Sequence, residues 1–432
     1  MSIAESLGAA GRDGWLLFST RFIRLFAYGA LSVVLVLYLV EVGLTTAQAG
    51  VLLTLTLLGD TAVSLAITTH ADRFGRRRML MVGAVLMAAA GLVFVSTAQF
   101  WLLLVAATIG VLSPSGQEVG PFLPIEQAAL SRTVSDRART NVFGWYALVG
   151  AVATACGSLA AGYLAPALQR SSHSTIAGYR GIVVLYAALG VVLALVFFQL
   201  SADVEAPAAS SGAERRSSLG SLTGLEHSRS VVARLSALFA LDAFGGGFVS
   251  QGLAAYWFHL RYGAEPALLG PMFFWANLLA GASALVAARL AARFGLIQTM
   301  VWTHLPSNVL LILIPLMPTL PWAVALLLLR FSISQMDVPA RQSYVMAVVP
   351  PEERSAAAGI TGVARTLGAA ISPLCVGIMF SRPALINVPF FVAGVLKIVY
   401  DVSLYKQFVH RDAVPVGGVA DRPATRCAEP DS

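Results

Sequence analysis

The chain has 432 residues, of which 57% are hydrophobic and only 12% are charged, about half the charged share of a soluble domain. This composition excludes a soluble globular protein, because too few polar side chains exist to cover a water-facing surface, and a lipid bilayer is the expected environment. The formal net charge of +7 could suit a nucleic-acid-binding protein. Basic loops on one side of a membrane explain it without nucleic acid.

Twelve apolar stretches are long enough to cross a bilayer, which takes about 20 helical residues each. A short N-terminal segment (1–14) precedes them, and a tail (408–432) that we expect to be disordered follows them. The sequence therefore predicts an all-α polytopic membrane protein with twelve transmembrane helices. In chain order, the predicted spans are 15–41, 47–69, 79–98, 101–130, 141–167, 179–200, 232–260, 266–290, 296–318, 321–349, 355–380 and 384–407.

A polar stretch, 201–230, separates the first six spans (15–200) from the last six (231–407), and its composition indicates a flexible linker. With the N-terminus in the cytoplasm, nineteen of the 29 basic residues fall in cytoplasmic segments and six within spans. The positive-inside rule then predicts that the linker and both termini are cytoplasmic. We expect the protein in the inner (plasma) membrane of a bacterium. The four basic residues on the other side are Arg170, Arg180, Arg261 and Arg382.

The two halves contain a repeat at residues 49–75 and 269–295. Gly50 precedes Arg73 by 23 positions, Gly270 precedes Arg293 by 23 positions, and both copies read Arg-Phe-Gly at the end. Coincidence between two helices rich in Gly, Ala and Leu is the alternative explanation. Together with the central linker, the repeat favours two pseudo-symmetric six-helix bundles, the design of carriers that bind their solute between the halves.

The loop after the second span reads HADRFGRRRML (70–80). It resembles the loop between the second and third helices of the major facilitator superfamily, whose pattern is Gly-x-x-x-Asp-Arg-x-Gly-Arg-Arg, with Thr68 in place of the leading glycine. The segments 288–295 and 362–373 also resemble parts of that family. The resemblance extends over the whole chain in layout and implies the family's two-bundle fold. The matching residues of the loop are Asp72, Arg73, Gly75, Arg76 and Arg77.

The resemblance also implies a gate in this loop. Asp72 would lie at the N-terminus of the eleventh helix, where the helix dipole stabilises a carboxylate. Arg76 would pair with an acid at the cytoplasmic end of the fourth helix, either Glu126 or Asp136. These contacts, with Arg73 and Gly75, would hold the halves together when the carrier opens outward. A solvated basic loop is the alternative, but it requires neither Asp72 nor Gly75.

We single out eleven ionisable residues inside the predicted spans, where charges are costly and usually face a cavity or the protein interior. In the family that the chain resembles, helices 1, 4, 7 and 10 line the central cavity, and eight of the eleven lie on these four. This concentration indicates a polar transport path. The residues are Arg21, Arg24, Asp60, Glu118, Glu126, Asp242, Arg330, Asp337, Arg341, Arg365 and Lys397.

Depth within the spans separates these candidates. Asp60, Glu118 and Asp337 lie near the middle and are the candidate proton-binding groups, because a desolvated carboxylate takes up a proton and releases it when water or an arginine approaches. A static buried ion pair is the alternative for each. Arg330 is also central, whereas we expect Arg21, Arg341 and Lys397 to extend toward the span ends.

Two further expectations concern the solute site. Arg24 and Asp242 lie at similar depths in equivalent helices, which predicts an ion pair across the halves. Prolines at 114, 121 and 124 interrupt the fourth span, and we expect the freed segment to present Gln117, Glu118 and Gln127 to the solute. Helix kinking alone is the alternative.

These patterns predict a secondary active transporter of a small organic solute that works by alternating access and is coupled to protons. Export is slightly favoured, because Gly150, Gly157 and Gly162 resemble the family's antiporter motif, although its proline is missing. The alternatives are a proton-coupled uptake carrier and a non-transporting sensor or scaffold. The sequence has no nucleotide-binding loop or metal-ligand spacing, so we expect a monomer with no enzymatic activity and no cofactor, whose partners are the solute, protons and the bilayer.

Overall fold

The computed structural model describes residues 11–134, 136–205, 225 and 228–409, without the side chains of residues 132, 133, 136–140 and 203. Within these ranges the chain forms only helices and the turns between them. This confirms the predicted all-α fold class. Most of the N-terminal segment, the linker and the tail lies outside the described residues.

The first half of the chain supplies the helices that we call the first bundle. They are α2 (Gly11–Glu41), α3 (Thr46–Phe74), α4 (Arg76–Ser96), α5 (Phe100–Ile109), α6 (Phe122–Thr133), α7 (Asp136–Ser172) and α8 (Thr175–Phe198), followed by the short helix η1 (Ala202–Val204).

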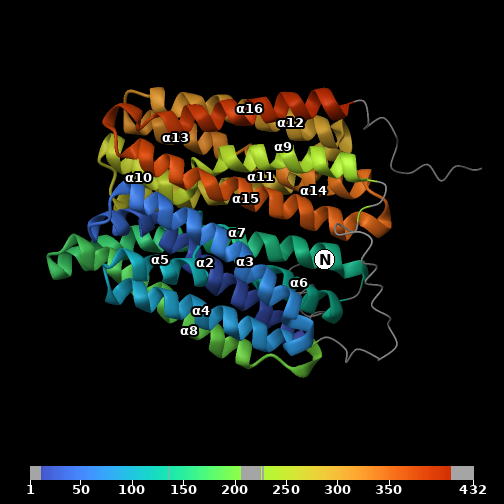
Figure 1. The fold of residues 1–432 in the computed structure, drawn as a ribbon, viewed down its shortest axis with the longest axis horizontal. Helices are drawn as coiled ribbons and strands as arrows, with labels where there is room; N and C mark the ends of the chain where they lie inside the picture. Colours follow the sequence, from blue (N-terminus) through green and yellow to red (C-terminus); the bar gives the residue numbers. More distant parts are fainter. Residues whose placement is uncertain (1–10, 135, 206–224, 226–227, 410–432) are drawn as a thin grey trace, which may run out of the picture.

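The second half supplies the second bundle. Its helices are α9 (Arg229–Gly247), α10 (Gln251–Tyr262), α11 (Pro266–Phe294), α12 (Leu296–Leu313), η2 (Ile314–Leu316), α13 (Leu320–Phe331), α14 (Asp337–Val348), η3 (Pro351–Glu353), α15 (Arg354–Phe380), η4 (Pro383–Leu385) and α16 (Val388–Phe408). In Figure 1 the first bundle occupies the lower half of the molecule and the second bundle the upper half.

Within the described ranges, ten helical stretches are long and apolar enough to cross a membrane. The predicted fourth and tenth spans fall short of this length because each is divided: α5 and α6 are separated by residues 110–121, and α13 and α14 by residues 332–336. In the fourth span, Pro114 and Pro121 cannot continue a helix, and Gly116 and Gly120 adopt positive φ angles of 70° and 83°. Backbone of this kind is tolerated at membrane depth only inside protein or along a cavity.

The two bundles meet along two helix pairs, α3 with α15 and α7 with α11. Glycines permit the close approach: a Cβ atom on Gly162 would lie 2.8 Å from the Cα of Gly270, and one on Gly50 would lie 3.0 Å from the Cα of Gly377. All four glycines lie toward the end of the molecule remote from Gly11 and Phe408. We call that end the opposite end, and the end where α2 begins and α16 ends the basic end.

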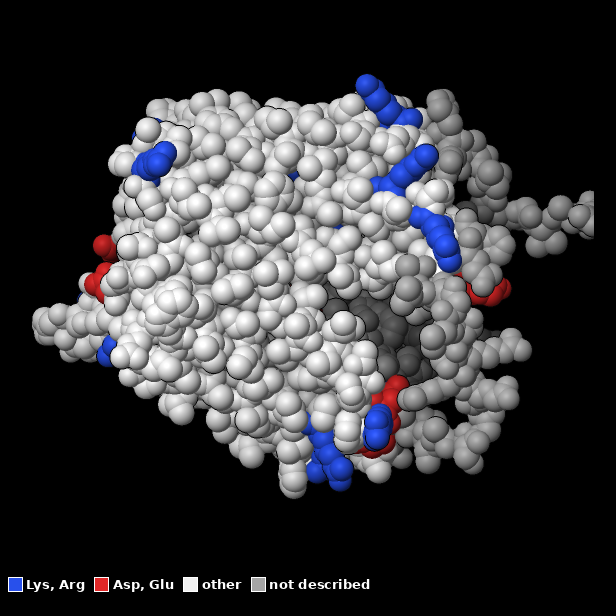
Figure 2. Space-filling view, viewed as in Figure 1, with Lys and Arg blue, Asp and Glu red and all other residues white. Residues whose placement is uncertain are grey.

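Polar contacts also join the bundles toward the opposite end. Thr46 and Ser381 share a hydrogen bond of 2.8 Å between their hydroxyl oxygens. Gln251, the first residue of α10, donates from Nε2 to the hydroxyls of Ser32 (2.8 Å) and Ser158 (3.1 Å). In the space-filling view the surface is hollowed between the two bundles toward the basic end, and the flank between the two ends is almost free of charge (Figure 2). The molecule is therefore closed at the opposite end and open at the basic end.

Candidate functional site

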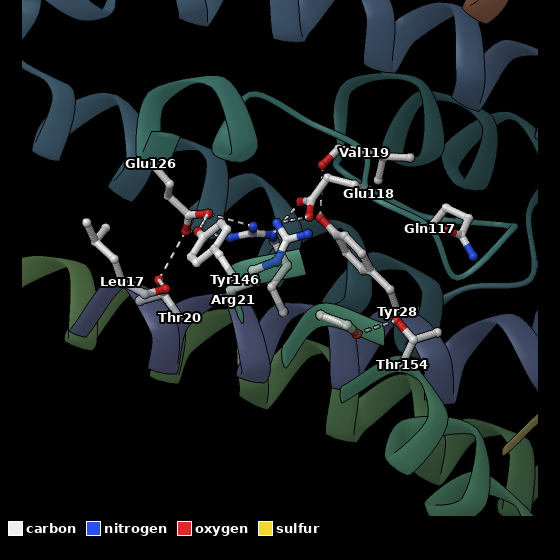
Figure 3. Close-up of polar contacts among 12 residues, drawn as sticks. Leu17, Thr20, Arg21, Tyr28, Gln117, Glu118, Val119, Glu126, Tyr146 and Thr154 are labelled. Carbon is white, nitrogen blue, oxygen red and sulfur yellow. Dashed lines mark hydrogen bonds and ion pairs between the residues drawn. The ribbon is translucent and has the colours of Figure 1, made fainter. Parts of the chain in front are cut away.

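Two arginines and two glutamates form a buried cluster inside the first bundle (Figure 3). Arg24 on α2 donates both Nη atoms to the two carboxylate oxygens of Glu126, at 2.7 Å each, and its Nε atom to Glu118 at 2.9 Å. Arg21, one turn away, donates to the other oxygen of Glu118 at 2.8 Å. We call Arg21, Arg24, Glu118 and Glu126 the first-bundle cluster. Its formal charges sum to zero.

The division of the fourth span positions both glutamates. Glu118 lies on the unwound segment 110–121 and Glu126 on α6, so that both carboxylates reach α2. Thr20 donates to Glu126 at 3.0 Å, and the Tyr146 hydroxyl on α7 also donates to it. The guanidinium of Arg24 covers the ring of Phe122, 4.6 Å from its centroid. A buried ion pair persists only with such additional partners, which indicates that this cluster is a fixed part of the bundle.

A second cluster surrounds Asp242 of α9. Its carboxylate contacts Lys397 at 2.6 Å, Arg341 at 3.1 Å and Arg365 at 3.4 Å, and these cations come from three different helices, α16, α14 and α15. Arg341 also pairs with Asp337, one turn earlier on α14, at 2.8 Å. We call Asp242, Asp337, Arg341, Arg365 and Lys397 the second-bundle cluster. Most of these side chains are buried, but Arg365 remains 34% exposed.

A buried polar triad lies beside this cluster. His304 and Asn308 of α12 contact the carboxylate of Asp401 on α16, at 2.8 Å from Nδ1 of His304 and 2.9 Å from Nδ2 of Asn308. The Nε2 atom of His304 lies 3.8 Å from Asp242 and so links the triad to the cluster. Our sequence reasoning missed these residues. The available signal was that His304 and Asp401 are ionisable and lie within predicted spans.

Within the described part of the chain, two charged residues that form no ion pair also have a buried side-chain atom without a hydrogen-bond partner. Asp60 of α3 is 7% exposed, and its Oδ1 atom is buried without a hydrogen-bond partner. Arg330, in the last turn of α13, likewise has a buried Nε atom without a hydrogen-bond partner. Its guanidinium lies 5.2 Å from the ring centroid of the adjacent Phe331.

The structure contradicts several sequence predictions about these charges. Arg24 and Asp242 do not pair across the bundles, because each is saturated by partners within its own bundle. Arg21, Arg341 and Lys397 do not extend to the span ends, since buried carboxylates hold them inside. Glu118 and Asp337 both lie in ion pairs. A static ion pair was the alternative to a proton-binding role for each of them.

The predicted solute contact Gln117 lies on the exposed part of the unwound segment. Its backbone carbonyl accepts a hydrogen bond of 2.7 Å from Ser113. Figure 3 shows its side chain apart from the charged groups of the first-bundle cluster. Gln117 is therefore accessible and is not part of the fixed ion-pair network.

The loop at residues 70–80 makes contacts different from those that we expected. Asp72 is 69% exposed and pairs at 2.8 Å with Arg76 of its own bundle, because the bundles are apart at the basic end. The prediction that Arg76 pairs with Glu126 is wrong, since Glu126 is bound to Arg24. The other candidate, Asp136, has a side chain outside the described part of the structure. Gly75 has a φ angle of +100°, which favours glycine at this turn, and Arg73 is exposed.

Glu205, which follows η1, was not predicted. Its carboxylate accepts hydrogen bonds from the backbone N–H groups of Arg76 (2.5 Å) and Arg77 (3.2 Å) at the start of α4. An acid at a helix N-terminus satisfies free N–H groups and interacts favourably with the dipole. The start of the linker is thereby joined to the loop at residues 70–80.

The fifth-span glycines all lie at close packing contacts. A Cβ atom on Gly150 would lie 2.8 Å from Nε of Arg21, and one on Gly157 would lie 2.0 Å from the carbonyl oxygen of Phe26. Gly162 lies against Gly270 of the second bundle. Packing therefore accounts for all three glycines.

Comparison with known proteins agrees with this architecture. Residues 17–373 match the sequence profile of the Major Facilitator Superfamily. The chain is 30% identical to a protein of Saccharomyces cerevisiae named "Uncharacterized membrane protein YJR124C", over 94% of this chain and 96% of that protein.

Solved structures share the fold at low sequence identity. The nucleoside transporter NupG superposes with a TM-score of 0.69 at 13% identity, covering 91% of this chain and 98% of that one. The xylose transporter XylE from E. coli gives a TM-score of 0.68 at 15% identity, covering 91% and 95%. A bacterial homologue of the human lysosomal transporter Spinster, in an inward-facing and occupied conformation, gives 0.70 at 17% identity, covering 93% and 98%.

Proposed function

The chain belongs to the major facilitator superfamily, and we propose that it is a proton-coupled secondary active transporter that moves a small organic solute by alternating access. It is an integral membrane transporter and not an enzyme. The observation that carries the proposal is the asymmetry between the two ends. The bundles touch through glycine pairs at the opposite end and enclose a hollow at the basic end. Alternating access requires this arrangement and its reverse.

Asp60 is our candidate for the coupling proton. The first-bundle and second-bundle clusters hold Glu118 and Asp337 in ion pairs with arginines, whereas no described cation pairs with Asp60. A desolvated carboxylate without a cation is stabilised by taking up a proton, and it can release the proton when the surroundings become wet. Intramembrane carboxylates of this kind commonly form proton paths.

We also propose that the loop at residues 70–80 is a gate that closes in the outward-open state. In that state Asp72 would leave Arg76 and contact the start of α15, while Arg73, Gly75 and Arg76 would hold the loop. The exposure of Asp72 at the basic end supports this proposal, because its carboxylate is accessible to a residue of the other bundle.

The basic end would then face the cytoplasm, with both termini there, as the positive charges predict. The plasma membrane is the location that we propose.

We predict that Asp72→Asn slows solute exchange by about two- to fivefold, since a carboxylate at a helix N-terminus contributes about 0.5–1 kcal/mol. Exchange of labelled solute in proteoliposomes measures the rate. Glu41→Gln, an exposed acid at the opposite end, is the matched control and should exchange at the wild-type rate. Altered solute preference in Asp72→Asn would contradict a gating role.

Reconstitution tests the proposed function. Purified protein is placed in liposomes loaded with a pH-sensitive dye, and candidate solutes are added outside one at a time. If solute and proton move together, the lumen becomes acidic, and if they exchange, it becomes alkaline; export by antiport, favoured by the sequence, predicts the alkaline change. If folded protein moves neither protons nor any solute, the carrier proposal fails and a sensor or scaffold becomes the better explanation.

A further inference from the structure

Arg330 faces the protein interior from within a membrane segment. It lies seven and three residues after Ala323 and Leu327, which are 0% and 3% exposed, so the three share one face of α13. The exposed residues Trp322 and Leu329 mark the lipid-facing side. Arg330 is therefore not a surface arginine that reaches the lipid headgroups.

The second bundle has more positive than negative charge around this position. Four cations, Arg330, Arg341, Arg365 and Lys397, accompany three carboxylates, Asp242, Asp337 and Asp401. Arg341 binds both Asp337 and Asp242, whereas Asp401 is bound by His304 and Asn308. Among the described residues, none forms an ion pair with Arg330. Protonation of His304 would only increase the excess.

An uncompensated guanidinium is costly at this depth, because desolvating an ion is repaid only by a counter-charge and hydrogen bonds. The other three cations have carboxylate partners within the second bundle: Arg341, Arg365 and Lys397. Arg365 is the least firmly held of them, with a contact of 3.4 Å to Asp242 and an exposure of 34%. Arg365 is therefore the cation of the second-bundle cluster that is most available to an external ligand.

We propose that the transported solute is an organic anion whose carboxylate or phosphate group is bound by Arg330, with Arg365 as the second contact. The planar guanidinium matches either group through paired N–H donors. This inference rests on the proposed function and adds the chemical class of the solute. The first bundle contains the opposite case, because Asp60 is a carboxylate that no described cation pairs with.

The first test needs no ligand and compares the melting temperatures of the purified full-length protein and two variants. Arg330→Met should raise the melting temperature by about 2 °C or more, because it removes a guanidinium that has a buried Nε atom without a hydrogen-bond partner and forms no ion pair among the described residues. Arg341→Met is the matched control and should lower it, because Asp337 loses its arginine. A large fall for Arg330→Met would mean that Arg330 has a structural partner and would overturn the proposal.

The second test adds ligands in matched pairs: benzoate and benzamide, nicotinate and nicotinamide, and glycerol phosphate and glycerol. We expect at least one anion to raise the melting temperature of the wild type, its neutral counterpart to have no effect, and Arg330→Met to lose the shift. The pairs distinguish carboxylate from phosphate. Equal shifts with neutral partners, equal shifts in Arg330→Met, or no shift with any anion would overturn the proposal.

The two proposals can fail separately. Anion binding that depends on Arg330, without movement of any solute in proteoliposomes, would refute the transport function and leave the anion site standing. Transport of neutral and anionic solutes at equal rates in both wild type and Arg330→Met would refute the anion site and leave the transporter standing.

Discussion

Asp242→Asn is expected to destabilise the protein by about 3–5 kcal/mol, the usual effect of removing one partner from a buried ion pair. Asp242 is 3% exposed and is the only described carboxylate in contact with Lys397 and Arg365. The amide would leave Lys397 buried without a counter-charge and would remove the ion-pair partner of the partly exposed Arg365. The free energy of unfolding in detergent, from a denaturant titration, measures the effect.

A second substitution separates this mechanism from simple loss of packing. Lys397→Met in the Asp242→Asn background removes one of the stranded cations and should recover part of the lost stability, a coupling that a double-mutant cycle measures. Asp72→Asn, which changes an exposed acid in the same way, should have little effect. If Asp242→Asn lowers the free energy of unfolding by less than about 1 kcal/mol, the cluster does not hold the second bundle together.

The all-α fold could be predicted from the sequence because membrane insertion requires long apolar helices with internally bonded backbone. The repeat around Gly50 and Gly270 identifies residues that the structure places at the contacts between the bundles. Interrupted helices were harder to predict. Prolines signal the division of the fourth span, but residues 332–336 of the tenth span contain no proline.

Partners of charged residues could not be predicted reliably, because helix depth does not determine helix rotation. Arg24 and Asp242 lie at comparable depths, yet each pairs within its own bundle: Arg24 contacts carboxylates and Asp242 contacts cations. The sequence indicates which residues are costly in lipid, and the packing of neighbouring helices decides which of them neutralise one another. Asp60 and Arg330 can be recognised as uncompensated only after all other pairs are known.

These two residues differ from the rest of the buried charge in their physical consequences. Apart from Arg365, the ion-paired residues already have their counter-charges within the protein, so a transport cycle can leave their contacts unchanged. Asp60 carries a negative charge that a proton can neutralise, and Arg330 carries a positive charge that an anionic solute can neutralise. Because an unpaired charge is costly inside the protein, a proton bound at Asp60 and an anion bound at Arg330 would each lower the free energy of the bundle that holds the residue.

Asp60→Asn should abolish proton-driven accumulation of solute while exchange of labelled solute stays within about twofold of the wild type, because the amide keeps the size of the side chain but cannot bind a proton. Removing an unpaired buried carboxylate should not lower stability. The measurement combines solute accumulation under an imposed pH gradient, the dye signal in the lumen, exchange at equal pH and the melting temperature.

Glu118→Gln is the informative comparison for this prediction. It removes the carboxylate that contacts both Arg21 and Arg24, so stability, accumulation and exchange should all fall together. Loss of accumulation in Asp60→Asn alone, with a wild-type melting temperature, would identify a coupling residue. Retained accumulation against a solute gradient in Asp60→Asn would exclude Asp60 from proton coupling, whatever its effect on the rate.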